Sequence, residues 1–116
     1  MPRSPRKGMI FRLRNGGTPE TKPRPILVLS RIELNGGKYL IVAPFTTKRL
    51  AERIGRPAFV LFEAGEFGLT ERCVLQADQV AKLEFNQVNI AQGALGTLPD
   101  DRLAEVDSAI RYVFDL

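Results

Sequence analysis

The chain contains no histidine and a single cysteine, Cys73, which limits the chemistry that its side chains can perform. A Ser–His–Asp triad, a Cys–His nucleophile pair and an HExxH zinc site all require histidine, so these catalytic classes are excluded. One cysteine cannot form an intrachain disulfide or a cysteine-rich metal site, and we expect Cys73 to be a small core residue.

Positive charge is concentrated in the first half of the chain. Residues 1–57 carry thirteen Lys or Arg and three Glu, a net charge of +10, whereas residues 58–116 carry four Lys or Arg and ten Asp or Glu, a net charge of −6. This asymmetry indicates a positive surface for a polyanion or an acidic partner, with an uneven solvated surface as the alternative. The basic residues that could follow a nucleic-acid backbone are Arg12, Arg14, Lys22, Arg49, Arg53 and Arg56.

The 116 residues, 44% of them hydrophobic, predict one globular domain. We expect a flexible basic N-terminus over residues 1–7 and a single domain over residues 8–116. No apolar run approaches the roughly 18 residues of a membrane span. The basic N-terminus and the short apolar stretch after it imitate a signal peptide, but Arg12 and Arg14 interrupt that stretch. We therefore expect a cytoplasmic protein without membrane association.

Short apolar runs separated by turn residues predict a series of strands. The expected strands cover residues 8–13, 25–30, 38–44, 58–62, 71–79 and 94–98. Pro44 should end the third of these because proline has no N–H to donate, and Asn35-Gly36-Gly37 should form the turn before it. Residues 46–54 are expected to form one or two helical turns, and residues 85–90 are ambiguous.

The C-terminal segment has the clearest pattern. Leu103, Val106, Ile110, Val113 and Phe114 fall on one face of a helix, and Pro99 with the acidic residues after it suits a helix start. Several short strands with one C-terminal helix predict a mainly β fold, built as a small, strongly curved sheet or barrel.

Three stretches resemble, in order, the MazF/PemK/Kid family of toxins. They are Lys7-Gly8-Met9-Ile10, Arg24-Pro25-Ile26-Leu27-Val28-Leu29-Ser30 and Val42-Ala43-Pro44-Phe45-Thr46-Thr47. The likeness continues through Gly68-Leu69, Val74-Leu75-Gln76-Ala77-Asp78-Gln79-Val80, Leu83, Gly96 and the terminal helix. It therefore covers roughly residues 7–116.

The resemblance implies an SH3-like barrel of the MazF/PemK/CcdB type that forms a homodimer. It also implies the toxin of a toxin–antitoxin pair, an endoribonuclease that cleaves single-stranded RNA with sequence selectivity and without a metal ion or cofactor. The RNA's own 2′-hydroxyl attacks the adjacent phosphate, which leaves a 2′,3′-cyclic phosphate and a 5′-hydroxyl. The implied partner is an acidic antitoxin whose tail occupies the RNA groove, and the basic first half of the chain agrees with both ligands.

By the same resemblance, catalysis falls to Arg24 and Thr46. Arg24 matches the family's arginine directly before proline, and its planar guanidinium can donate two hydrogen bonds to a phosphate. Thr46 matches the family's threonine at the end of an apolar strand, where its hydroxyl can donate to a non-bridging phosphate oxygen. The structural alternatives are a surface ion pair for Arg24 and a strand-end or turn-capping role for Thr46.

Further residues are expected to contact RNA. Asp78 and Gln79 end a predicted strand and can hydrogen-bond base edges, with solvated polar side chains as the alternative. Glu20 is the nearest carboxylate before Arg24 that could serve as a base, with a solvated loop charge as the alternative. The complete predicted RNA-binding set is Glu20, Thr47, Lys48, Asp78, Gln79, Arg12 and Arg14.

Two other functions stay open. Gyrase-inhibiting toxins share this barrel and act through the terminal helix, so trapped DNA breaks without RNA cleavage would favour that function. An inert RNA-binding module would bind RNA in a salt-sensitive manner without cutting it.

Overall fold

The structure is a computed structural model that describes residues 5–14, 24–32, 34 and 37–116. The strands in this part of the chain are β1 (Met9–Arg12), β2 (Pro25–Val28), β3 (Tyr39–Thr46), β4 (Phe59–Phe62), β5 (Cys73–Gln76), β6 (Ala81–Glu84) and β7 (Gly96–Thr97). The α-helices are α1 (Leu50–Arg53) and α2 (Asp100–Phe114), and short 3₁₀ helices are η1 (Glu66–Gly68), η2 (Ala77–Gln79) and η3 (Phe85–Gln87).

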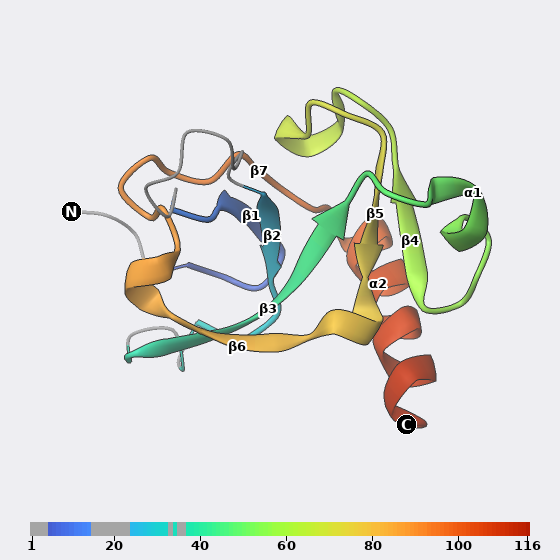
Figure 1. Ribbon diagram of the computed structural model, residues 1–116. Helices are drawn as coiled ribbons and strands as arrows, with labels where there is room; N and C mark the ends of the chain where they lie inside the picture. Colours follow the sequence, from blue (N-terminus) through green and yellow to red (C-terminus); the bar gives the residue numbers. More distant parts are fainter. Residues whose placement is uncertain (1–4, 15–23, 33, 35–36) are drawn as a thin grey trace.

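The strands form one antiparallel sheet in the order β4-β5-β3-β2-β1-β7, with β6 paired to β3 beside this path (Figure 1). Strand β3 has eight residues and pairs with β2 along one edge. Along its other edge it pairs first with β6, where Val42 faces Ala81, and then with β5, where Phe45 faces Leu75. The change of neighbour lets the sheet curl into the half-barrel that the sequence predicts, so the predicted fold class is confirmed.

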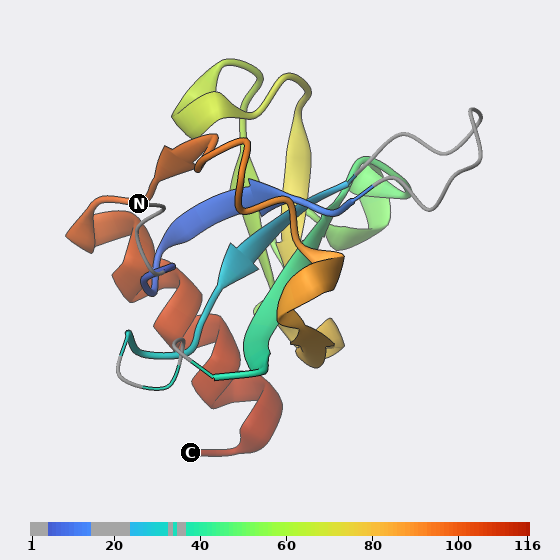
Figure 2. The same cartoon turned by 90° about the vertical axis from the view of Figure 1, so that its left-hand side faces the viewer.

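Two apolar clusters cover the two faces of this curved sheet. Leu27 belongs to the cluster that packs against Val106 of α2, whereas Ile26 and Val28 belong to the cluster inside the curl, with Leu40 and Val42. Successive strand residues point to opposite faces, so β2 must be apolar on both sides. This explains why its sequence is a continuous apolar run. Figure 2 shows α2 lying along one side of the sheet.

The predicted end of the third strand at Pro44 is wrong. Pro44 lies inside β3 and pairs with Ile26 of β2. The Leu29 N–H donates to the carbonyl of Ile41 at 2.8 Å, and alternation from this bonded pair turns the nitrogen of Pro44 away from β2. The Pro44 nitrogen thus faces the edge of β3 where the neighbouring strand changes from β6 to β5, so proline removes no ladder hydrogen bond there.

The predicted strand over residues 71–79 is too long, and one strand was missed. Strand β5 covers only Cys73–Gln76, and η2 then turns the chain into β6. The residues of β6 read Ala-Lys-Leu-Glu, and only Leu83 is even half-buried, so no alternating apolar pattern marks this strand. The other predicted strands correspond to β1, β2, β4 and β7, and the predicted helices to α1 and α2.

Helix η1 packs backbone against backbone on β7. A Cβ added to Gly68 would lie 2.1 Å from the carbonyl oxygen of Leu95, and one added to Gly96 would lie 2.1 Å from that of Phe67. Gly65, in the same turn, also has a positive φ of 90°, but a Cβ there would meet nothing within 4 Å. Substitutions at Gly65 and Gly68 can therefore distinguish the cost of a left-handed backbone from the added cost of a close backbone contact.

We expect Gly68→Ala to destabilise the protein far more than Gly65→Ala. The Gly65 variant should cost about 1 kcal/mol because only left-handed strain is added, and the Gly68 variant at least about 3 kcal/mol because β7 must also move. Urea unfolding of both variants measures the difference. Equal losses would contradict the close packing of η1 on β7.

Candidate functional site

Arg24 and Thr46 lie at neighbouring ends of two paired strands. Arg24 continues the line of β2, and its carbonyl accepts a hydrogen bond from the N–H of Leu13 at 3.1 Å. Ile26 pairs with Pro44, and the same register continued by two residues would put Arg24 opposite Thr46. Alternation makes this a non-hydrogen-bonded pair, in which opposed side chains share a face and approach most closely. The two predicted catalytic residues thus lie at neighbouring ends of paired strands.

The two side chains differ in exposure. Arg24 is exposed and has no side-chain hydrogen bond or ion pair with another residue in the described ranges. Thr46 is 7% exposed, and its Oγ1 accepts a hydrogen bond from the backbone N–H of Lys48 at 3.2 Å. Thr46 thus has the turn-capping contact of the structural alternative, while its hydroxyl hydrogen has no acceptor among the described residues.

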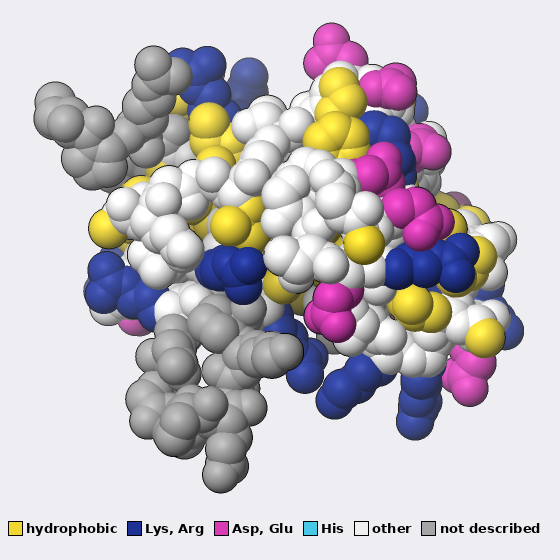
Figure 3. All heavy atoms as spheres, turned by 90° about the horizontal axis from the view of Figure 1, so that it is seen from above, with side chains coloured by type: hydrophobic (Ala, Val, Ile, Leu, Met, Phe, Trp, Pro, Cys, Tyr) yellow, Lys and Arg dark blue, Asp and Glu magenta, His cyan; other side chains and the backbone are white. Residues whose placement is uncertain are grey.

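A basic turn follows Thr46. Thr47 and Lys48 are exposed, and Arg49 has a left-handed backbone with φ of 54° before α1 begins. This turn follows the end of β3, the strand that pairs with β2, and Arg24 directly precedes β2. Figure 3 shows Lys and Arg side chains projecting along the lower side of the molecule, whereas most Asp and Glu side chains gather at the upper right.

The other predicted RNA-binding residues are not all at this place. Arg12 pairs with Pro25, which puts it at the same end of the sheet as Arg24 but on the opposite face, and Arg14 follows it. Asp78 and Gln79 are exposed in η2, which lies beside the middle of β3 on the edge away from β2. The prediction that they end a strand is therefore wrong. Glu20 lies outside the described residues.

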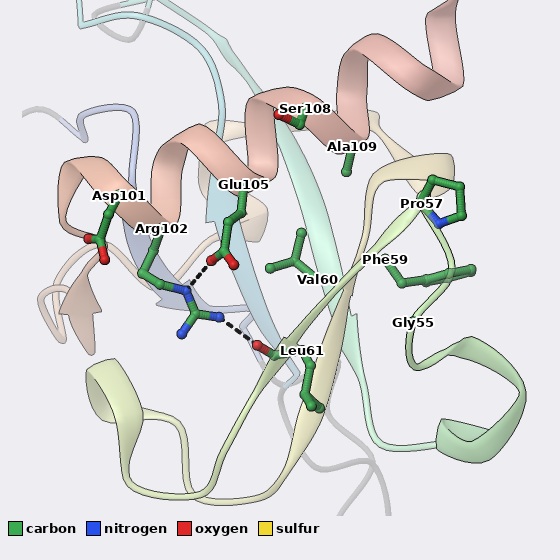
Figure 4. A pocket seen from close by; sticks show the side chains of 10 residues that line it. All are labelled: Gly55, Pro57, Phe59, Val60, Leu61, Asp101, Arg102, Glu105, Ser108 and Ala109. Carbon is green, nitrogen blue, oxygen red and sulfur yellow. Dashed lines mark hydrogen bonds and ion pairs between the residues drawn. The ribbon is translucent and has the colours of Figure 1, made fainter.

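A separate groove of about 800 Å³ lies between β4 and α2 (Figure 4). Its central side chain is Arg102, which donates to the carbonyl of Leu61 and forms ion pairs with Glu105 and Glu66. The Arg102 guanidinium also stacks 4.2 Å from the ring centroid of Phe62. No sequence pattern pointed to this groove, because its residues come from segments far apart in the chain. The Arg102 guanidinium is thus held inside the groove by ion pairs, a backbone carbonyl and an aromatic ring.

Cys73 is not an available nucleophile. It is 3% exposed, and burial together with the nearby charges of Glu71 and Glu66 raises the pKa of its thiol from 9.0 to about 11. At neutral pH the thiol is therefore protonated. Within the described ranges, no group of three or more Cys, Asp or Glu side chains could hold a metal ion.

Comparison with known proteins places the chain in a family. Residues 7–114 match the PemK-like, MazF-like toxins of type II toxin–antitoxin systems. The chain belongs to this family. The resemblance drawn from the sequence is thereby confirmed. A search of curated protein sequences found no significant match for this toxin.

Solved structures of similar fold cover nearly the whole toxin. A MazE–MazF complex from Deinococcus radiodurans is 26% identical with a TM-score of 0.72, and covers 97% of this chain and 98% of its own. The Mycobacterium tuberculosis toxin MazF-mt6 is 23% identical with a TM-score of 0.74, over 93% and 97%. A mycobacterial endoribonuclease bound to its cognate antitoxin is 19% identical with a TM-score of 0.74, over 97% and 96%. The described part of the toxin contains no helix long and apolar enough to span a membrane.

We expect Thr46→Val to lower the free energy of unfolding by about 1 kcal/mol, because the Lys48 N–H loses its acceptor. Thr46→Ser keeps the acceptor and should lose less than half of this. Urea denaturation measures both variants. Equal stability of the two would show that the hydroxyl contact does not hold the turn.

Proposed function

We propose that this toxin is an endoribonuclease that cleaves single-stranded RNA at a site built around Arg24 and Thr46. The observation that supports it most is an exposed guanidinium without a protein partner in the described ranges, facing a threonine across the β2–β3 pair. A basic turn follows that threonine directly. Family membership agrees with this reading, since a mycobacterial structure of the same fold is described as an endoribonuclease.

The proposed reaction is a transesterification within the RNA. A bond forms between the 2′-oxygen and phosphorus while the bond from phosphorus to the 5′-oxygen breaks, which leaves a 2′,3′-cyclic phosphate and a 5′-hydroxyl. Negative charge develops on the non-bridging phosphate oxygens. The exposed Arg24 and the buried Thr46 would each donate hydrogen bonds to these oxygens. Because the arginine guanidinium is a permanent cation in proteins, we assign Arg24 to charge stabilisation and not to proton transfer.

Residues around this pair extend the RNA site. Thr47 and Lys48 lie next to the proposed scissile phosphate, and Arg12 and Arg14 reach the same end of the sheet. Asp78 and Gln79 lie across β3, so we assign them to base edges of a nucleotide further along the strand. Glu20 belongs to the proposed RNA-binding set as a carboxylate that could accept a proton, with a solvated loop charge as the alternative, and the proposed reaction requires no metal ion or cofactor.

We also propose that the toxin is a homodimer that binds an acidic antitoxin. Exposed apolar side chains gather at the start of β3 and before it, and at the end of α2, both at the lower side of Figure 1. They are Ile32, Leu34, Tyr39, Ile41, Tyr112, Phe114 and Leu116. A second copy would remove them from water. An acidic antitoxin segment would be attracted to the basic turn at residues 47–49, and the Deinococcus radiodurans toxin is solved with MazE.

The cleavage prediction concerns Arg24. The purified toxin should cut a long RNA in the presence of EDTA, with cyclic-phosphate ends, and Arg24→Gln should lower the rate by about 10²–10³-fold because one charge-stabilising donor is lost. Arg72→Gln removes the same charge from an exposed ion pair with Glu63 and should change the rate less than about twofold. Primer extension locates the cuts.

Three outcomes would contradict this assignment. Intact RNA at micromolar toxin, with salt-sensitive binding, would favour an inert RNA-binding module. Trapped DNA breaks without RNA cleavage would favour the gyrase-inhibitor type. Cleavage that survives Arg24→Gln would move the chemistry to other residues.

The dimer prediction concerns the end of α2. Light scattering should give twice the mass of one chain, and Tyr112→Glu should shift the mass toward one chain because a charge would be buried at the interface. Thr70→Glu, at an exposed residue before β5, is the matched control and should remain dimeric. A wild-type monomer at tens of micromolar would overturn the proposed dimer.

A further inference from the structure

Two side chains fix the two backbone polar groups of Lys48. The Lys48 N–H donates to Oγ1 of Thr46 at 3.2 Å, and the Lys48 carbonyl accepts a hydrogen bond from Nη1 of Arg53 at 2.9 Å. With both groups bonded, the direction in which the Lys48 side chain leaves the backbone is set. That side chain is itself exposed, two residues after the end of β3.

Arg53 is held in turn by β4. Its guanidinium carbon lies 5.7 Å from the ring centroid of Phe59, within the range of a cation–π contact. Helix α1 has only four residues, too few to be stable through its own hydrogen bonds. The contacts of Arg53 therefore tie α1 to β4 on one side and to the basic turn on the other.

From these contacts we infer that Arg53 is a positioning residue for RNA cleavage, which holds the Lys48 ammonium toward the phosphate bound by Arg24. This inference rests on the proposed function and deepens it. The sequence placed Arg53 among side chains that could follow the RNA backbone directly. In the structure one nitrogen of its guanidinium donates to the Lys48 carbonyl and its guanidinium carbon lies over the ring of Phe59, so its effect on RNA passes through Lys48.

A double-mutant cycle separates positioning from direct contact. Arg53→Gln and Lys48→Gln should each lower kcat/KM by about tenfold, and the double variant should be no worse than Lys48→Gln alone, because coupled residues are not additive. Binding to a 2′-O-methyl RNA that cannot be cleaved, measured at several salt concentrations, gives a second readout. Each single variant and the double variant should lose one phosphate contact, about 0.7 in the slope of log K against log salt. Arg72→Gln is the charge-matched control.

Two results would overturn the inference. Multiplied losses near 100-fold, with a slope reduced by about twice 0.7, would mean that Arg53 contacts phosphate itself. Wild-type behaviour of Arg53→Gln would mean that Lys48 needs no support.

If Arg53→Gln is unfolded, Phe59→Leu removes the ring beneath Arg53 without changing any charge and should reduce kcat/KM by about threefold while the salt slope falls. If the wild type binds RNA without cutting it, the proposed function fails, but the binding cycle still decides the role of Arg53.

Discussion

The pairing of β3 with three other strands is the constraint on which the rest of the structure depends. Its register with β2 determines that residue 24 lies opposite residue 46, and a slip of one residue would turn the two side chains to opposite faces. Its change of neighbour from β6 to β5 curls the sheet around one apolar cluster and leaves the other for α2. The same strand thus determines both cores and the geometry of the site.

The turn after β3 combines positive charge with an ordered backbone. The positive charge of the first half of the chain is presented from a turn whose backbone is hydrogen-bonded on both sides of Lys48. On the face seen in Figure 3, Asp and Glu side chains are most frequent at the upper right. A phosphate approaching Arg24 therefore meets donors that are already ordered, and it does not compete with a carboxylate of the described residues for that guanidinium.

Much of the fold follows from local pattern, whereas the details of the site do not. The apolar run of β2 and the helical periodicity of α2 were readable because burial forces those patterns. Strand β6 could not be predicted from the sequence, because it has a single half-buried residue and its conformation depends on pairing with β3. The continuation of β3 through Pro44 depends on which side its nitrogen faces, and that is a property of pairing. The placement of Arg24 and Thr46 came from family resemblance, but no pattern indicates that Arg53 bonds to a carbonyl five residues earlier.

Arg102 has a consequence beyond the groove in which it lies. Strand β4 ends the sheet on one side, and a bare strand edge is a template on which another chain can polymerise. Here the carbonyl of Leu61 is occupied by Arg102, and the N–H of Phe59 by the carbonyl of Arg56. Two of the backbone groups along this edge are thus hydrogen-bonded within the chain, which leaves fewer of them for a strand of another molecule.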